Sequence, residues 1–440
     1  MLLIYVDKLT NRLGYTLNLL FKELMSIRYS ITIDKEYFVQ YDGPKFSYTT
    51  QPITDELFLL STPLLFQTLI EITDVNYFEK NNTPYLFRIY SKDSVCDFDI
   101  FAACFYLVSR YEEYLPYVKD KHSRYKAQDS LAYKKNFLKK PVVNIWANEF
   151  KRKILERYPE LYSENKKYSY INTIDIDSAY SYTCKGFNRN LFGFLRDLLR
   201  GKLSLCFERL KVLLKIEKDP YNTFDFIISL IEKHKIDTIF FVLYGGYGKY
   251  DKNITPYNNK FRILIKSLCD YAKVGVHPSY DSFDYPQLIT SQTKMLKETL
   301  HKPIKRSRYH YLRFCLPEGY RNLIATGSIE HDFSMGYSDC IGFRAGICSC
   351  FNFYDLAMDY ETTLKVHPFA YMDVALKNGL KLSPQQSLEE IKQLNDEVKN
   401  VGGEMISIWH NESLSNKREW FGWREVYEKV IEYSYNEKIN

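Results

Sequence analysis

Two aspartates at the end of a strand-like run are the residues of this chain best suited to chemistry. Asp175 and Asp177 follow the apolar run 171–174, and their spacing places both side chains on one face of an extended chain. Two carboxylates on one face repel each other, so such a pair is expected mainly where a cation, a shared proton or a reacting group needs it. The sequence therefore predicts a functional site at this strand end.

Three further strand-like runs end in a histidine. They are 274–276 before His277, 306–309 before His310 and 406–409 before His410. Imidazole and carboxylate groups together form a good ligand set for zinc or iron, and a catalytic metal needs about three protein ligands and one open position. The combination is typical of a metal-dependent hydrolase.

The elements that must position these residues alternate from about residue 168 onward. Strand-like runs are 171–176, 238–244, 273–276, 306–310, 328–333, 341–345, 362–367 and 404–409, and helical patterns are 223–234, 259–272, 286–300, 317–326, 387–401 and 420–435. Such alternation predicts an α/β fold with a parallel sheet, long enough to close into a barrel. Chemistry in β/α barrels sits at the carboxyl ends of the strands, where the candidate residues fall.

The first 165 residues have a different character. A strand is expected at 2–6, an amphipathic helix at 14–25 and two more helices at 99–114 and 141–158, with short strands and turns between them. We therefore predict a smaller α+β N-terminal domain at residues 1–165 and a (β/α) barrel at residues 166–440.

Composition narrows the class of protein. The 440 residues carry 60 Lys and Arg against 54 Asp and Glu, interspersed along the chain, so a nucleic-acid partner is not expected. Nine cysteines without a CxxC pair favour free thiols in a reducing compartment. No targeting segment and no apolar run of roughly 18 residues is visible, so a cytoplasmic protein without a transmembrane segment is expected.

Several short motifs resemble those of the polysaccharide deacetylase (NodB-homology) superfamily, in a divergent bacterial branch with an additional N-terminal domain. They lie at 175–180, 275–280, 307–313, 332–337, 342–346, 367–369 with 372–373, and 409–414, and the segment 109–114 resembles the same branch. The resemblance implies a distorted (β/α) barrel that removes N- or O-acetyl groups from a carbohydrate in surface polysaccharide metabolism. It also implies one divalent metal ion, zinc, with iron, cobalt or nickel as alternatives.

The resemblance further implies roles for individual residues. Asp175 becomes the catalytic base, Asp177 and His277 metal ligands and His410 the general acid, although the two aspartates are adjacent in the usual motif and their order here stays open. The usual second histidine, four residues after His277, is Asp281 in this chain. We therefore predict His310 as the third ligand, with Asp281 as the alternative.

Four more side chains are assigned around these. Arg308 is expected to orient the base, with Arg313 as the alternative. Arg344, Tyr337 and Trp409 are expected to bind substrate, Arg344 through a carboxylate or phosphate group.

Two other functions stay open. A non-catalytic carbohydrate-binding relic of the same fold would explain the missing second histidine. A glycosyltransferase could use Asp175-x-Asp177 to hold a metal and a nucleotide sugar, but it would want a nucleotide-binding β–α–β half before the motif, which residues 1–165 are not expected to form. It would also leave His277, His310 and His410 without a role.

Overall fold

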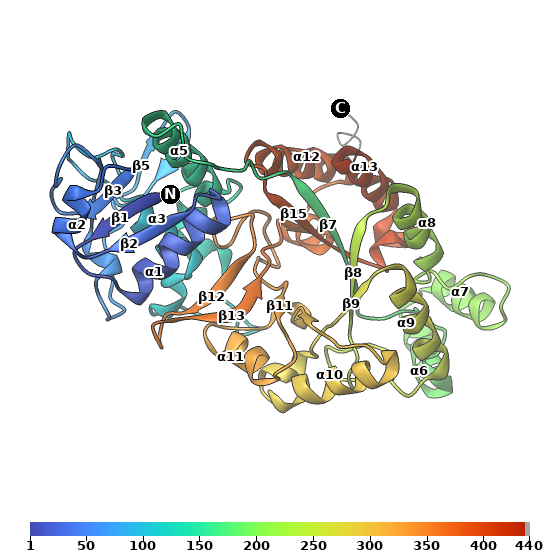
Figure 1. Ribbon diagram of the computed structural model, residues 1–440. Coiled ribbons are helices and arrows are strands. Elements are labelled where there is room, and N and C mark those ends of the chain that lie inside the picture. Colours follow the sequence, from blue (N-terminus) through green and yellow to red (C-terminus); the bar gives the residue numbers. More distant parts are fainter. Residues whose placement is uncertain (436–440) are drawn as a thin grey trace.

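The computed structural model describes residues 1–435, which contain two large sheets (Figure 1). The first has the order β2-β1-β3-β4, and all its pairings are parallel. Its strands are β1 (Leu2–Val6), β2 (Tyr29–Thr32), β3 (Lys45–Thr49) and β4 (Leu57–Leu60). Helix α1 (Asn11–Leu17), continued by a π-helix to Leu24, joins β1 to β2, and α2 (Lys35–Gln40) joins β2 to β3.

This arrangement corrects one prediction. The strand at 2–6 is confirmed, but the N-terminal region is not α+β, because its main sheet is parallel with helical crossovers. Contrary to the prediction, residues 1–165 do alternate over β1-α1-β2-α2-β3, whereas β3 and β4 are joined without a helix. The half-buried β2 and the short β4 lack the strong apolar alternation that would have revealed them.

The rest of the N-terminal region packs against this sheet. It comprises the hairpin β5 (Phe78–Lys80) and β6 (Thr83–Tyr85), with helices α3 (Ile100–Val108), α4 (Leu131–Lys134) and α5 (Val142–Arg157). Every residue of α3 is buried, and Asp99 caps its first turn by accepting hydrogen bonds from the backbone N–H groups of residues 101 and 102. The helix predicted at 141–158 is confirmed; the one predicted at 99–114 ends at Val108, and after the left-handed Arg110 a separate 3-10 turn covers Tyr111–Tyr114.

The second sheet has nine strands in the order β12-β13-β11-β10-β9-β8-β7-β15-β14. They are β7 (Ser169–Ile176), β8 (Asp237–Val242), β9 (Lys273–Val276), β10 (Arg306–Ser307), β11 (His331–Asp332), β12 (Phe351–Asp355), β13 (Tyr360–Val366), β14 (Tyr371–Met372) and β15 (Glu404–His410). Only β12 and β13 pair antiparallel. Strands β12 and β14 are the two edges of this sheet and are not paired with each other, so the predicted closed barrel is not shown.

Eight helices accompany this sheet in the described part of the chain. They are α6 (Gly186–Leu199), α7 (Leu203–Leu213), α8 (Phe224–His234), α9 (Asn259–Tyr271), α10 (Gln287–Leu300), α11 (Glu318–Ala325), α12 (Pro384–Asn400) and α13 (Trp423–Tyr435). The last six were predicted within a few residues, and local signals mark them. In α12, for example, Ser383 and Gln386 form a reciprocal capping box, with Pro384 at the first helical position. Helices α6 and α7 were not predicted.

One predicted strand does not exist. Residues 341–345 form a buried loop in which Phe343 donates its backbone N–H to the Leu138 carbonyl oxygen. Gly342 has a φ of +120°, and a Cβ there would lie 2.3 Å from that oxygen, so the close approach requires glycine. The apolar run is explained by burial against the N-terminal region rather than by strand pairing.

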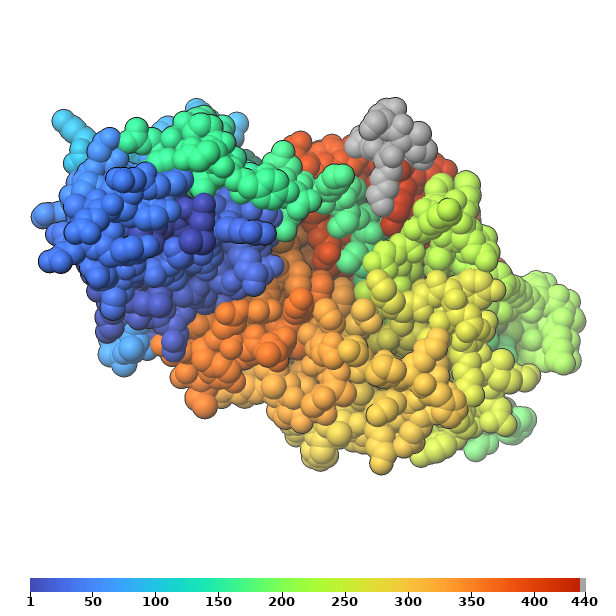
Figure 2. Space-filling view, in the orientation of Figure 1, coloured from blue at the N-terminus to red at the C-terminus, as the bar shows by residue number. Residues whose placement is uncertain are grey.

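A buried ion cluster joins that region to the second sheet. The Glu113 carboxylate forms ion pairs with two arginines: Oε2 lies 2.6 Å from Nη2 of Arg344, and Oε1 lies 2.7 Å from Nε of Arg110. Burial disfavours the Glu113 carboxylate, but the two arginines outweigh it and lower its pKa. The contact fixes residues of the N-terminal region against the loop that leads to β12, where the two parts lie side by side in Figure 2.

Two expectations from composition can be compared with this fold. All nine cysteines carry free thiols. Among residues 1–435, no helix is long and apolar enough to cross a bilayer.

Candidate metal centre

The pairing register of the strands places the predicted aspartates and histidines at one end of the second sheet. His410 is the pairing partner of Asp175 across β15 and β7, and β8, β9 and β10 follow in parallel register. Below them, apolar side chains including Ile239, Phe241 and Ile406 form a buried cluster. The packed interior therefore supports a polar layer made from the carboxyl ends of five strands.

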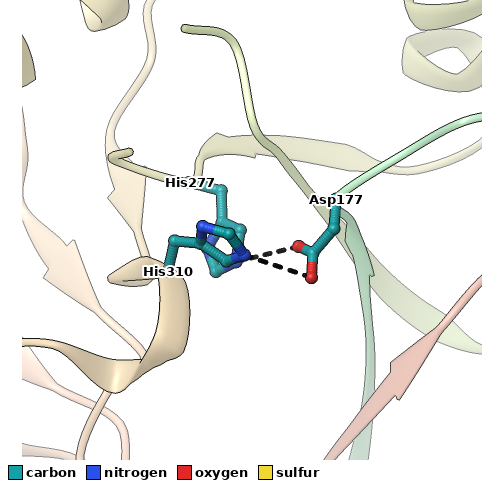
Figure 3. Close-up of side chains that lie close together, drawn as sticks. All are labelled: Asp177, His277 and His310. Carbon is teal, nitrogen blue, oxygen red and sulfur yellow. Dashed lines mark ion pairs between the residues drawn. The ribbon is translucent and has the colours of Figure 1, made fainter. Parts of the chain in front are cut away.

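Asp177, His277 and His310 come together in that layer. One ligand atom from each lies within 4.8 Å of the others. The Nε2 atoms of His277 and His310 are each 3.3 Å from a carboxylate oxygen of Asp177 (Figure 3). In the described residues no other group of His, Cys, Asp and Glu side chains meets the same criterion. One carboxylate and two imidazoles form the donor set expected for zinc or a similar ion.

Hydrogen bonds on the far side of each ring orient the two imidazoles. The Nδ1 atom of His277 donates to the Arg308 carbonyl oxygen, which can only accept, so Nε2 is the atom that faces Asp177 and is placed to coordinate a metal. The Nδ1 atom of His310 lies 2.7 Å from Oδ1 of Asp251, which is buried. Such partners fix the tautomer and raise the basicity of metal-binding histidines.

The charge of Asp177 is stabilised by its neighbours. Burial disfavours the carboxylate, but His310, His277 and His410 outweigh it and hold the pKa of Asp177 well below its usual range. Burial likewise favours neutral His310, yet Asp177 and Asp251 raise the pKa of that imidazole to about 9. Within residues 1–435, Oδ1 of Asp177 is buried without a hydrogen-bond donor, as expected of an oxygen directed at a cation.

Asp175 has a different environment from Asp177. Its Oδ1 accepts a 2.7 Å hydrogen bond from Arg308, which is fully buried and also donates to Thr173 and to the Phe333 carbonyl oxygen. Its Oδ2 is 3.7 Å from Nε2 of His277. Asp175 is therefore held at the edge of the cluster by Arg308, whose Nε and Nη1 groups have partners, while Nη2 is buried with no hydrogen-bond partner among the described residues. Arg313, the alternative, instead pairs with Asp284.

His410 approaches the cluster from β15, which pairs with β7 on the side away from β8. Its Nδ1 lies 2.8 Å from Oδ1 of Asp373, whose other oxygen accepts the His410 backbone N–H. Burial opposes protonation, but Asp373 and the cluster carboxylates raise the pKa of His410 well above its usual value. Nε2 of this ring is 3.8 Å from Asp177. The arrangement places beside the two aspartates an imidazole whose charged form is favoured by its carboxylate neighbours.

These residues line one pocket of about 550 Å³. Its lining includes Asp175, Asp177, His277, His310 and His410. Lys121, His122 and Arg124 of the N-terminal region line it too, and His122 is anchored by a 2.9 Å hydrogen bond between its Nδ1 and the Tyr280 hydroxyl. A larger cavity elsewhere on the surface contains none of the cluster residues. The smaller pocket is therefore the candidate site because of the residues that line it and not because of its volume.

Four predicted side chains lie elsewhere. Arg344 and Tyr337 are buried in the ion cluster with Glu113 and Arg110, and Trp409 is fully buried against Tyr371 and Tyr427. None of the three lines the pocket, so the prediction that they contact substrate there is wrong. Asp281 is exposed and outside the cluster, which leaves His310 as the third candidate ligand.

Two functional partners escaped the sequence analysis. Asp373 lies in the motif at 372–373, for which the sequence predicts no separate role, and no sequence pattern marks Asp251. Asp251 lies in the connection between β8 and α9 and accepts the Tyr280 backbone N–H as well as contacting His310, so only the folded chain reveals its partner.

Removing the Asp251 carboxylate tests the orientation of His310. We expect Asp251→Asn to weaken metal binding by about 10- to 100-fold, since the amide cannot hold the imidazole as a carboxylate does. Titration with Zn²⁺ against a competing chelator measures the effect. Asp281→Asn is the matched control and should bind as the parent protein does; the reverse ranking would make Asp281 the ligand.

Comparisons with known proteins add little beyond this geometry. A model of a family of unknown function (DUF7033) matches residues 2–159. No curated protein matches the chain. A provisionally assigned polysaccharide deacetylase from Mycobacterium smegmatis is 12% identical, with 61% of this chain and 86% of that chain covered and a TM-score of 0.39.

Two further solved structures are similar over the same share of the chain. A polysaccharide deacetylase from Bacillus cereus is 12% identical, with 62% of this chain and 89% of that chain covered and a TM-score of 0.30. A CE4-family pseudoenzyme from Bacillus anthracis is 13% identical, with 62% and 63% covered and a TM-score of 0.27. At such values the likeness carries no argument, and the residues of the site must carry the functional conclusion.

Proposed function

We propose that the protein is a metal-dependent hydrolase that removes acetyl groups from a carbohydrate. The observation that supports this best is the convergence of Asp177, His277 and His310 beside a second, separately held carboxylate and a protonated imidazole. A binding site for a metal alone would not need Asp175 and His410 positioned by their own buried partners. The combination suits hydrolysis, where a proton is taken from water and another is given to the leaving group.

The donor set fits one divalent ion, which we propose to be zinc. Asp177 and the Nε2 atoms of His277 and His310 would hold it; when bound, such an ion polarises an acyl carbonyl and lowers the pKa of water. Asp175 accepts the water proton, and Arg308 keeps that carboxylate directed at the pocket. His410 donates a proton from Nε2 to the departing amine or alkoxide oxygen, while Asp373 stabilises the imidazolium.

Acetate release from a panel of N- and O-acetylated sugars tests this function. We expect release by the zinc-loaded protein and none after chelation, with activity restored by added metal. His410→Asn, whose amide can still donate a hydrogen bond to Asp373 but cannot act as an acid, should retain metal and lose most of the release.

The same panel separates the alternatives. Sugar binding without acetate release by the zinc-loaded protein would favour a carbohydrate-binding relic. Release that persists at full rate in the chelated protein would contradict a metal-dependent hydrolase.

A further inference from the structure

The hairpin formed by α6 and α7 exposes an unusual amount of apolar surface. Of the fifteen Leu and Phe residues that are large and exposed in the described chain, eleven lie between residues 187 and 214. The most exposed include Leu199 at 88%, Phe187 at 78% and Phe192 at 69%. Isolated apolar side chains on a surface are ordinary, but a contiguous set of this kind marks an interaction surface.

The interior of the hairpin contains a buried ion pair beside Cys206 and Val212. Asp197 of α6 and Arg209 of α7 form a 2.7 Å ion pair, and both side chains are almost fully buried. Arg209 also donates to Oδ1 of Asn190. A Cβ at Gly193 would lie 2.7 Å from the guanidinium, so a larger residue there would make the arginine side chain shift. The two helices thus hold each other through charges and turn their leucines and phenylalanines outward.

Charge distinguishes this segment from the rest of the chain. Residues 185–218 contain nine Lys and Arg and three Asp and Glu, a net charge of +6. The whole chain also has a net charge of +6, so the remaining residues are balanced. Arg200 and Lys202 flank Gly201 at the turn, directly beside Leu199 and Leu203. Apolar side chains interspersed with cations are what an anionic lipid surface attracts.

The dimensions favour a surface position over a span. Helix α6 has 14 residues, which corresponds to a length of about 21 Å. The hydrocarbon core of a bilayer is about 30 Å thick. The hairpin also lies at the end of the molecule opposite to β1–β4, where it projects from the helices around the second sheet (Figures 1 and 2). It can therefore reach a flat surface without a clash from the N-terminal region.

We propose that the α6–α7 hairpin docks the protein on an anionic lipid bilayer. Leu199, Phe192 and their apolar neighbours enter the headgroup region, and the surrounding Lys and Arg side chains contact lipid phosphates. The hairpin belongs to the connection between β7, whose end carries Asp177, and α8. Docking surface and pocket therefore both lie at the carboxyl end of the second sheet.

Co-sedimentation of the full chain with phosphatidylcholine vesicles, with and without phosphatidylglycerol, tests the proposal. We expect binding to the anionic vesicles that weakens as salt is raised. F192E/L199E should lower the partition coefficient by about 100-fold or more, because the variant loses the favourable transfer of two large apolar side chains from water into the bilayer. The matched control is Ile72→Glu, since Ile72 is equally exposed, at 87%, but lies in the N-terminal region.

A second pair of variants separates charge from apolar contact. R200E/K202E should lower binding to anionic vesicles by at least about tenfold and leave the weak binding to neutral vesicles unchanged. Lys22→Glu, whose side chain is 70% exposed outside the hairpin, should have no effect. All substitutions are at solvent-exposed positions, and circular dichroism checks that the variants fold.

Two outcomes would overturn the proposal. One is equal binding of F192E/L199E and the parent chain to anionic vesicles. The other is no vesicle binding together with a concentration-dependent dimer that F192E/L199E dissociates, which would make a second copy of this chain the occupant of the surface. Neither measurement requires metal or catalysis, so the result is independent of the proposed hydrolase activity.

Discussion

Replacing Asp175 with asparagine is expected to lower the rate of acetate release by about 10²- to 10⁴-fold, the usual contribution of a general base. The amide is the same size and can still accept the Arg308 hydrogen bond, but it cannot take a proton from water. Because Asp175 is outside the Asp177, His277 and His310 cluster, the variant should keep its metal. Steady-state kinetics and metal content, measured on the same preparation, check both parts.

The control for this variant is Asp339→Asn. Asp339 lines the same pocket, but its carboxylate accepts only from Gln128 among the hydrogen bonds of the described side chains. It should retain the parent rate. Full activity in Asp175→Asn would reassign the base, and loss of metal in that variant would make Asp175 a ligand.

Glu113→Gln is expected to lower the free energy of unfolding by about 3–5 kcal/mol, the usual effect of removing one partner from a buried ion pair. The substitution leaves the buried Arg344 without a carboxylate, whereas Arg110 keeps Glu112 at 2.8 Å. Urea denaturation of both proteins measures the difference. Glu298→Gln, which breaks the exposed pair with Lys294, is the control and should cause no measurable change.

The same pair of proteins gives a pH test. Because the folded-state pKa of Glu113 is lowered, its stabilisation is fully present above the unfolded-state pKa of about 4.3 and is lost as the pH falls through the lower folded value. The stability difference between the parent and Glu113→Gln should therefore shrink below about pH 4. A difference that stays constant into strong acid would mean that the carboxylate charge does not stabilise the fold.

Local sequence patterns were sufficient to predict which side chains lie at the carboxyl ends of the strands. Asp177, His277 and His310 each end a strand-like run, and parallel strands bring such ends to one edge, so the sequence could indicate that they meet. Their function stays a proposal. Asp251 could not be found in this way, because it lies in an irregular connection and its contact with His310 depends on the tertiary fold.

The errors have physical causes as well. Arg344 lies in an apolar run that suits a strand end, but its partner Glu113 is 231 positions earlier, and no local pattern reveals a buried ion pair over that separation. Helices α6 and α7 were missed although the apolar residues of α6 recur at helical spacing, at 187, 191, 195 and 198; what is unusual is that this stripe faces outward and not into the core. A segment that violates the usual pattern is a candidate for an interaction with something other than its own core.

The most direct test of the metal centre is the metal content of the purified protein by mass spectrometry, after incubation with Zn²⁺ and removal of free ion. We expect one ion per chain in the parent and little in Asp177→Ala, His277→Ala and His310→Ala. His122→Ala should keep its ion, because His122 lines the pocket but lies outside the cluster. A parent protein that retains no zinc, iron, cobalt or nickel, or ligand variants that retain as much as the parent, would contradict the metal centre and the hydrolase proposed from it.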